Sequence, residues 1–593
     1  MNLNKLSPLL QLVLLYEQYV SVEAFEEVTG QNILEQEWTV IVQYFEQLSE
    51  VNSRIPFSYN EISDRFAFVK INKDYIDALS NENSVFYIEL PRVMQYIAIE
   101  NSNAVCAPYS IHRPQSYNVT GKGVLLAVID SGIDYSHLDF RNADGTTRIL
   151  ALWDQSIEGT PPQGFSIGAY YSNKQIDEAL QQDSIIERLE IVPSVDVLGH
   201  GTAVAGVASG NGRASGGQNI GIAPEADLLI VKMNSRGTTL EDFRGPTNAD
   251  VMRGIAFAIT EATRLNMPLS LVAGVGLNEG GHVGSSSLEV FMNQMSLVWP
   301  SNMTVGTGNE ANKERHTSGR VRQGEIKNVQ IAIDAGQRFY TSNLYKNYVD
   351  GMSFVIIAPN GEKTDIIPDM NGNVAYVFGN TSVLINISTD PFTAQVQTLV
   401  LLLEGFGTAT VDSGIWTIQI IGDNIIDGRY NIWSTVTNPV IRTARFLEPD
   451  PFTTLTIPST AELITSVASI NGKTLQILNA SGRGFTADER VKPDVAAPGL
   501  NVMVPEAGTE DKYTFYSGSS IASGFVCGAY ALFMQYGLRV NPQSYLYGEA
   551  LKGLVIKYAK RPTQFDSYPN PAYGYGILCV SAVLEALKTI YNQ

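Results

Sequence analysis

The sequence predicts an α/β protein whose main part is a doubly wound parallel sheet. A continuous apolar run at 123–129 is typical of a strand buried on both faces of such a sheet. Strand and helix patterns then alternate along the chain, which favours parallel strands joined by helices. Between 312 and 443 the helix signals fade and short strands replace them, which predicts an inserted antiparallel sandwich or jelly roll.

A smaller α+β unit is expected before the parallel sheet, over residues 1–96. The chain up to about residue 35 has the mixed apolar and polar pattern of helices. The rest of this unit has patterns typical of strands at 38–44, 66–71 and 85–90, with a short helix at 73–79. Length alone suggests about three or four domains in total.

The parallel sheet is expected to occupy 97–311 and 444–593, on either side of the insertion. Its predicted elements include strands at 123–129, 220–223 with 228–232, and 270–273, a helix at 250–265, and a closing helix at 581–591. The insertion has predicted strands at 329–333, 353–358, 374–378, 383–387, 399–403 and 416–421. Turns rich in Gly, Asn and Asp, such as Pro359-Asn360-Gly361, separate these strands.

Composition excludes several classes of protein. Hydrophobic residues make up 44% of the chain and charged residues 17%, as in a globular protein with large cores. The net charge of −20 argues against a nucleic-acid partner. No apolar run is long enough to span a bilayer, and the apolar N-terminal stretch favours an amphipathic helix over a signal peptide. The three cysteines have no metal-ligand spacing, so we expect small buried side chains.

Three residues that could carry chemistry occur in a particular order. Asp130 directly follows the buried strand, His200 lies between glycines at a helix start, and Ser520 follows Gly518-Ser519 before an apolar, helix-compatible run. Each alone is more simply explained as a helix cap or, for His200, as a surface side chain. Together they predict an Asp…His…Ser triad, in which the imidazole takes the serine proton and the carboxylate fixes the imidazole tautomer.

A fourth candidate would stabilise the negative charge that such a reaction develops. Asn309 ends the glycine-rich segment Gly306-Thr307-Gly308-Asn309. An amide donor aimed at an oxyanion is worth about 3–4 kcal/mol in this type of site. The alternative is a turn asparagine with positive φ. A serine at a helix start also gains from unpaired N–H groups and from the helix dipole.

These motifs resemble those of the subtilisin-like serine peptidases, whose triad has the same chain order. The segments 481–484 (Ser-Gly-Arg-Gly) and 492–499 (Lys-Pro-Asp-Val-Ala-Ala-Pro-Gly) also resemble that family. The resemblance runs from about Gly121 to the C-terminus, with the sandwich as an insertion. It implies a serine endopeptidase that works through an acyl-enzyme on a protein or peptide substrate and needs no cofactor for the chemistry. Relatives often bind structural calcium, but the sequence identifies no ligand set and no metal site.

Two departures from the family pattern concern the nucleophile and the substrate-binding strand. The family usually has Gly-Thr-Ser where this chain has Gly518-Ser519-Ser520, which keeps a hydroxyl at the middle position. The family's Ser-Leu-Gly segment is Gly274-Val275-Gly276 in this chain. Its backbone would still pair with an extended substrate, while the missing serine side chain affects the wall of the S1 pocket.

A narrower resemblance comes from residues 145–155 (Gly-Thr-Thr-Arg-Ile-Leu-Ala-Leu-Trp-Asp-Gln), which are similar to the clostridial germination proteases of the Csp type. It implies a zymogen in which residues 1–96 hold an N-terminal helix and an inhibitory prodomain. The tail Val93–Tyr96 would then lie in the substrate cleft, with self-cleavage near Tyr96 or Ile97. In this type the prodomain can stay bound after cleavage. The expected substrates are spore germination proenzymes, and the expected location is the cytoplasm or the spore.

Two other functions remain open from the sequence. One is a pseudoprotease whose cleft is permanently plugged by the prodomain and which acts in binding or signalling. The other is a carbohydrate- or surface-binding protein in which the inserted sandwich is the functional part. The simpler expectation for the insertion is that it rigidifies the parallel-sheet domain.

Overall fold

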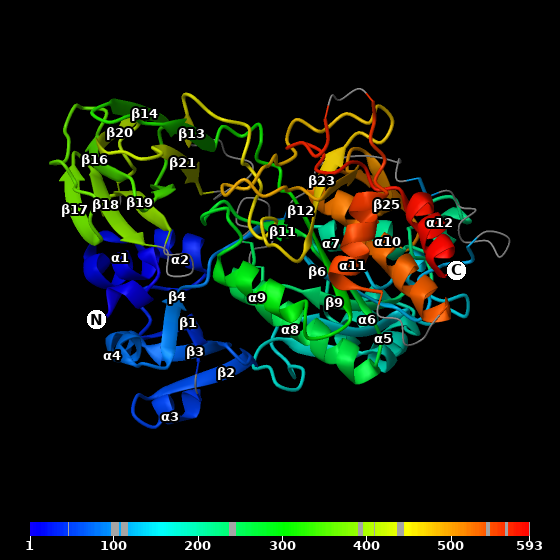
Figure 1. Cartoon of the computed structure of the whole chain (residues 1–593). Helices are drawn as coiled ribbons and strands as arrows, with labels where there is room; N and C mark the ends of the chain where they lie inside the picture. The colour runs from blue at the N-terminus through cyan, green and yellow to red at the C-terminus, as the bar shows by residue number, and fades with distance from the viewer. Residues whose placement is uncertain are drawn as a thin grey trace.

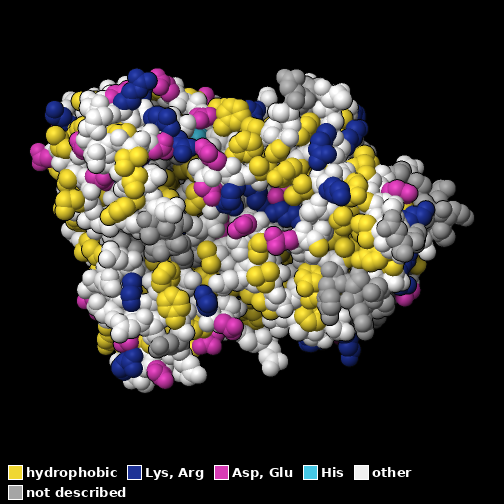
Figure 2. Space-filling model, in the orientation of Figure 1, with side chains coloured by type: hydrophobic (Ala, Val, Ile, Leu, Met, Phe, Trp, Pro, Cys, Tyr) yellow, Lys and Arg dark blue, Asp and Glu magenta, His cyan; other side chains and the backbone are white. Residues whose placement is uncertain are grey.

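The computed structural model describes residues 1–45, 47–96, 106–107, 117–235, 245–389, 395–407, 409–435, 444–540, 546–563 and 567–591. Three sheet assemblies make up the molecule (Figure 1): the N-terminal unit, a large parallel-sheet domain, and the insertion. On the face drawn in Figure 2, basic side chains are scattered among acidic and apolar ones.

The N-terminal unit is a four-stranded antiparallel sheet in the order β2-β3-β1-β4, preceded by two helices. Its elements are α1 (Pro8–Tyr16), α2 (Val22–Thr29), β1 (Glu37–Tyr44), α3 (Leu48–Asn52), β2 (Phe57–Ser63), β3 (Phe66–Asn72), α4 (Ile76–Asn81) and β4 (Val85–Glu89). The three predicted strands are confirmed. The edge strand β2 was not predicted, because most of its side chains are partly exposed and polar, so it lacks the alternation of a half-buried strand.

The parallel-sheet domain contains eight strands in the order β24-β23-β12-β10-β6-β9-β7-β8, and only β8 runs antiparallel to its neighbour. The strands are β6 (Leu125–Asp130), β7 (Ile149–Asp154), β8 (Ala169–Ser172), β9 (Asp227–Lys232), β10 (Leu269–Ala273), β12 (Ser301–Gly306), β23 (Thr465–Ile470) and β24 (Val495–Pro498). Every residue of the central strand β6 is buried. This confirms the predicted doubly wound sheet.

Helices cover both faces of this sheet. On one face α7 (His200–Ser209), α10 (Ser519–Val540) and α12 (Val580–Tyr591) share a core with Leu126 and Val128 of β6. On the other, α8 (Asn248–Leu265) and α9 (Ser287–Met295) share a core with the alternate residues of β6. The remaining helices are α5 (Asn173–Leu180), α6 (Ile185–Ile191) and α11 (Gly548–Lys557). Among the described helices, α10 is long and apolar enough to cross a membrane, but most of its length is buried inside the protein, as in a core helix.

One predicted strand of this domain is wrong. Residues 220–223 form no strand, and β9 begins only at Asp227. The amides of this segment bond to the end of α7 instead: Ile222 N–H donates to the Val207 carbonyl at 3.0 Å, and Ala223 N–H to the Ala208 carbonyl at 2.8 Å. The short apolar pattern therefore reflects packing against a helix end and not a place in the sheet.

The insertion consists of two antiparallel sheets with a common core, as predicted. The six-stranded sheet has the order β13-β21-β15-β19-β18-β17 and the four-stranded sheet the order β16-β20-β14-β22. The strands are β13 (His316–Arg320), β14 (Ile326–Ile333), β15 (Phe339–Asn347), β16 (Gly351–Ile357), β17 (Gly372–Phe378), β18 (Thr381–Thr389), β19 (Val396–Gly405), β20 (Gly414–Asn424), β21 (Arg429–Ser434) and β22 (Ala444–Phe446). Because β22 pairs with β14, the insertion extends past the predicted boundary at residue 443.

The N-terminal helices lie between the N-terminal sheet and the insertion (Figure 1). One apolar core contains residues of α1 and of the N-terminal sheet together with Phe339, Leu384, Val400 and Leu402 of the insertion. Several hydrogen bonds also cross this junction, among them one from Asn386 and one from Tyr16. Asn386 donates to the side-chain oxygen of Gln11 at 2.9 Å, and the Tyr16 hydroxyl donates to the Asn373 carbonyl at 3.0 Å. The insertion is therefore packed against the N-terminal unit as well as joined to the parallel-sheet domain.

Candidate active site

Three regular elements bring Asp130, His200 and Ser520 together. Asp130 is the last residue of β6, His200 is the first residue of α7, and Ser520 lies in the first turn of α10. His200 Nδ1 lies 2.6 Å from Asp130 Oδ1, and His200 Nε2 lies 2.8 Å from Ser520 Oγ. The three residues are at most 2% exposed. This is the arrangement in which a histidine can take a proton from a serine.

The nucleophile segment is held by a tight turn before α10. Gly518 has φ +141, a conformation open to glycine, and its N–H donates to the Gly499 carbonyl at 2.8 Å. The hydroxyl of Ser519 is also used, because its oxygen accepts the N–H of Gly308 at 3.0 Å. A hydroxyl at this position therefore couples the nucleophile turn to the segment that carries Asn309.

Asn309 lies just after β12, beside the start of α10. Its side-chain oxygen accepts the Ser519 N–H at 3.4 Å. Since this contact engages the oxygen, the amide nitrogen is the group left to act as a donor. The structure thus places Asn309 next to the nucleophile segment.

Gly274 follows β10, at a position where the family pattern has a serine. A Cβ atom at this position would lie 2.0 Å from Asp130 Oδ2 and 3.0 Å from His200 Cε1. No side chain fits there without moving the carboxylate. Within the described part of the chain, Asp130 Oδ2 has no hydrogen-bond partner.

The tail of the N-terminal unit lies against the expected substrate-binding strand. The short strand β5 (Gln95–Tyr96) pairs antiparallel with β11 (Val275–Gly276), so that Tyr96 lies opposite Val275 and Gln95 opposite Gly276. On the other side, Met94 N–H donates to the Pro246 carbonyl at 2.5 Å and Val93 bridges to Thr247. The tail is therefore held as an extended strand between two strand-like edges. Ile97 lies outside the described residues.

The segment just before this tail is fixed at the N-termini of α8 and α9. Asn248 of α8 donates to the Glu89 carboxylate at 3.4 Å, and Ser287 of α9 also bonds to it. Arg92 forms an ion pair with Glu279, and its N–H donates to Asn248 Oδ1 at 2.7 Å. Burial raises the pKa of Glu89 to about 7. Glu89 is one of the residues that line a cavity of about 270 Å³ between the N-terminal unit, the parallel-sheet domain and the insertion.

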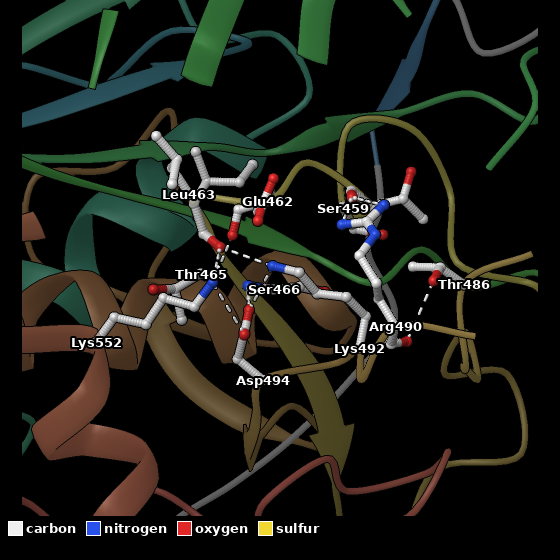
Figure 3. Close-up of polar contacts among 12 residues, drawn as sticks. Ser459, Glu462, Leu463, Thr465, Ser466, Thr486, Arg490, Lys492, Asp494 and Lys552 are labelled. Carbon is white, nitrogen blue, oxygen red and sulfur yellow. Dashed lines mark hydrogen bonds and ion pairs between the residues drawn. The ribbon is translucent and has the colours of Figure 1, made fainter. Parts of the chain in front are cut away.

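A buried charge cluster supports the strand that leads to the nucleophile turn (Figure 3). The Asp494 carboxylate lies 2.7 Å from Lys492 Nζ and 3.1 Å from Lys552 Nζ, and accepts the Ser466 N–H at 2.8 Å. Asp494 directly precedes β24, and Gly499 after β24 holds Gly518. The family-like segment at 492–499 therefore anchors the nucleophile turn to the sheet.

Sequence reasoning missed several of these contributors. Glu89, Arg92 and Lys552 carry no motif, and each is a charged residue among mostly apolar neighbours in the sequence. The implied calcium also gains no ligand set: in the described ranges no three His, Cys, Asp or Glu side chains gather as metal ligands would. That expectation stays a prediction.

Comparisons with known proteins support the same reading. A family model described as the subtilase family matches residues 121–261 and 442–576, and one described as the Csp protease B prodomain matches residues 4–92. The solved structure of the Clostridium perfringens CspB protease is 31% identical and superposes with a TM-score of 0.73. That comparison covers 82% of this chain and 97% of the CspB chain.

Curated relatives are more distant and longer. The minor extracellular protease Vpr of Bacillus subtilis is 23% identical over 79% of this chain and 52% of its own length. A PII-type proteinase of Lactococcus lactis subsp. cremoris is 22% identical over 80% of this chain and 26% of its own length. The chain thus spans a quarter to a half of these relatives. Since the subtilase model matches on both sides of the insertion and nearly the whole CspB chain is covered at 31% identity, the chain belongs to the subtilase family and to its Csp-type branch.

Proposed function

We propose that this chain is a serine endopeptidase made as a zymogen, with residues 1–96 as an inhibitory prodomain. The observation that carries the proposal is the continuous contact from Asp130 through His200 to Ser520, with the chain's own tail paired beside it on β11. A substrate peptide would replace the tail as an extended strand on Gly274–Gly276.

The reaction follows from this geometry. With a proton on His200 Nδ1, Nε2 accepts the Ser520 hydroxyl proton as the serine oxygen attacks the scissile carbonyl. The Asp130 carboxylate holds the imidazole tautomer and stabilises the imidazolium. Asn309 and the first-turn N–H groups of α10 stabilise the oxyanion, and the α10 dipole adds to them. The imidazolium then protonates the leaving amine, and water releases the acyl-enzyme by the same steps.

We assign self-processing to the bond region at Tyr96 and Ile97, because the described tail ends there and is paired with the expected substrate-binding strand. The prodomain stays bound after cleavage, held by α8 and α9, by the tail, and by the packing of α1 on the insertion. On the Csp resemblance the substrate is a spore germination proenzyme, and the location is the cytoplasm or the spore. The insertion serves to rigidify the enzyme and its prodomain.

Labelling with a fluorophosphonate tests the proposal. A single adduct on Ser520 in the folded, processed protein is the expected result, with Ser520→Ala as the unlabelled control. A folded, processed protein without an adduct would instead support the pseudoprotease alternative.

A further inference from the structure

A second buried carboxylate lies beside the triad. Asp196, in the loop before α7, is 4% exposed and accepts four hydrogen bonds. Its Oδ1 accepts from the Ser131 hydroxyl at 2.7 Å and from Gly199 N–H at 3.0 Å. Its Oδ2 accepts from the N–H of Thr202 at 2.8 Å and from the Thr202 hydroxyl at 2.7 Å. Every donor comes from a segment that carries a triad residue.

Asp196 supplies the cap that α7 otherwise lacks. The residue at the N-cap position is Gly199, with φ +68 and no side chain to accept the first amides. The carboxylate reaches these amides from three residues upstream and places negative charge at the positive end of the helix dipole. Because His200 is the first residue of α7, this cap fixes the backbone from which the imidazole extends.

Ser131 links the two carboxylates. Its N–H donates to Asp130 Oδ1 at 2.7 Å, its hydroxyl donates to Asp196, and its oxygen accepts the Gly201 N–H at 2.9 Å. The end of β6 and the start of α7 are therefore joined through one serine side chain. Thr202 adds a second link, since its hydroxyl oxygen accepts the Asp134 N–H at 2.9 Å.

The charge of Asp196 also acts near the imidazole. The ring of Tyr516 packs edge-on against His200, with centroids 6.4 Å apart. The pKa of the Tyr516 phenol is raised to about 12, mainly by burial and then by the charges of Asp196 and Asp130. The charges of both carboxylates therefore act on Tyr516, the side chain that packs against His200.

We infer that Asp196, acting through Ser131 and the first turn of α7, is the positioning residue that holds His200 between Asp130 and Ser520. This inference rests on the proposed peptidase function and deepens it. A purely structural cap would support folding and leave the titration of His200 unchanged. A positioning residue that also contributes charge changes both the rate and the pH at which the imidazole loses its proton.

The test measures the rate of fluorophosphonate labelling of the full chain between pH 5 and 9. In Asp196→Asn we expect labelling to slow about 10²-fold, because a small displacement of a reacting group has such an effect. Loss of a nearby negative charge destabilises the imidazolium, so the acid-side midpoint should move down by about half a pH unit. In Asp196→Glu, which keeps the charge, the midpoint should return towards that of the unsubstituted chain.

The matched control is Asp139→Asn. Asp139 is also buried in this domain and hydrogen-bonded, to the Tyr513 hydroxyl at 2.8 Å and the Ala214 N–H at 3.0 Å, but it does not contact the first turn of α7. The Asp139→Asn variant should be labelled at the rate of the unsubstituted chain, and the acid-side midpoint of its pH profile should be unchanged. If Asp196→Asn does not fold, Ser131→Ala is tested in its place, and we expect its labelling rate to be about tenfold lower than that of the unsubstituted chain.

Two failures can be told apart. If the unsubstituted chain labels and Asp196→Asn, or Ser131→Ala in its place, matches it in rate and midpoint, the positioning role is wrong and the peptidase proposal stands. If the folded, processed, unsubstituted chain does not label at all, the proposed function is wrong and the inference falls with it.

Discussion

The triad and the junction between α1 and the insertion are built in opposite ways. At the triad, three side chains meet through two short contacts. Displacing one of these side chains is therefore expected to remove the catalytic activity. At the junction, an apolar core and polar contacts such as Gln11 to Asn386 stabilise the packing, and each of many residues contributes a small part. Changes at the first region should therefore alter rate with little loss of stability, and changes at the second should do the reverse.

The largest effect on rate is expected from Asn309→Ala. Loss of this donor should lower kcat about 10²–10³-fold with KM little changed, because the oxyanion forms only during the reaction. Steady-state kinetics on a peptide substrate checks this. An unchanged kcat would remove Asn309 from the site.

A smaller loss of rate is expected from Gly274→Ala. The added Cβ would lie 2.0 Å from Asp130 Oδ2, so the carboxylate must shift away from His200. We expect labelling of Ser520 to slow about 10²-fold. The control is Gly553→Ala in α11, where nothing lies within 4 Å of the added atom. Equal labelling rates in the two variants would contradict the close approach at Gly274.

At the junction, Gln11→Ala should affect stability and not rate. Gln11 is buried, and it accepts from Asn386 while its amide donates to the Leu3 and Leu6 carbonyls at 2.9 Å. Its loss leaves buried polar groups unpaired, which costs about 1–3 kcal/mol. Denaturant unfolding should show this loss, with labelling of Ser520 retained. Gln182→Ala, at a partly exposed glutamine whose side chain donates to the Glu178 carbonyl at 3.1 Å, should leave both quantities unchanged.

The last effect concerns the binding of the prodomain and not the rate, and it depends on pH. Burial in the docked state raises the pKa of Glu89 from 4.5 to about 7, so docking favours the protonated carboxyl. The protonated Glu89 carboxyl contributes fully to prodomain binding below pH 4.5, and this contribution is lost as the pH rises to 7. Over that range binding weakens by at most about tenfold per pH unit. Binding measured on the processed complex at pH 5.5 and 8 checks this. Glu89→Gln, which cannot ionise, should bind equally at both pH values apart from any background shared with the unsubstituted protein.

The sequence predicted those parts of the molecule that depend on short segments. Asp130, His200 and Ser520 each lie where a regular element begins or ends beside glycines, so their placement follows from local pattern. The strand predicted at residues 220–223 was wrong, because a short apolar segment is equally compatible with a strand and with a loop that packs on a helix. The insertion's six predicted strands are confirmed, whereas β22 lies beyond the expected boundary at 443.

Contacts between distant polar residues could not be predicted. Gln11, Asn386 and Asp196 each lie among apolar neighbours in the sequence, which give no sign of the partners that these polar side chains find. Such side chains have no periodicity, and their partners are fixed only when the chain has folded. The same holds for Glu89, whose pKa is raised by burial and whose partners Asn248 and Ser287 lie more than a hundred residues later in the sequence.

The most direct test of the central claim is the N-terminal sequence and intact mass of the purified protein, compared with Ser520→Ala. The account predicts a cleaved chain with a new N-terminus just after the β5 tail at Gln95–Tyr96, and an uncleaved full-length chain for Ser520→Ala. Identical cleavage in both proteins would contradict it, because the cut would then not depend on the Asp130–His200–Ser520 site.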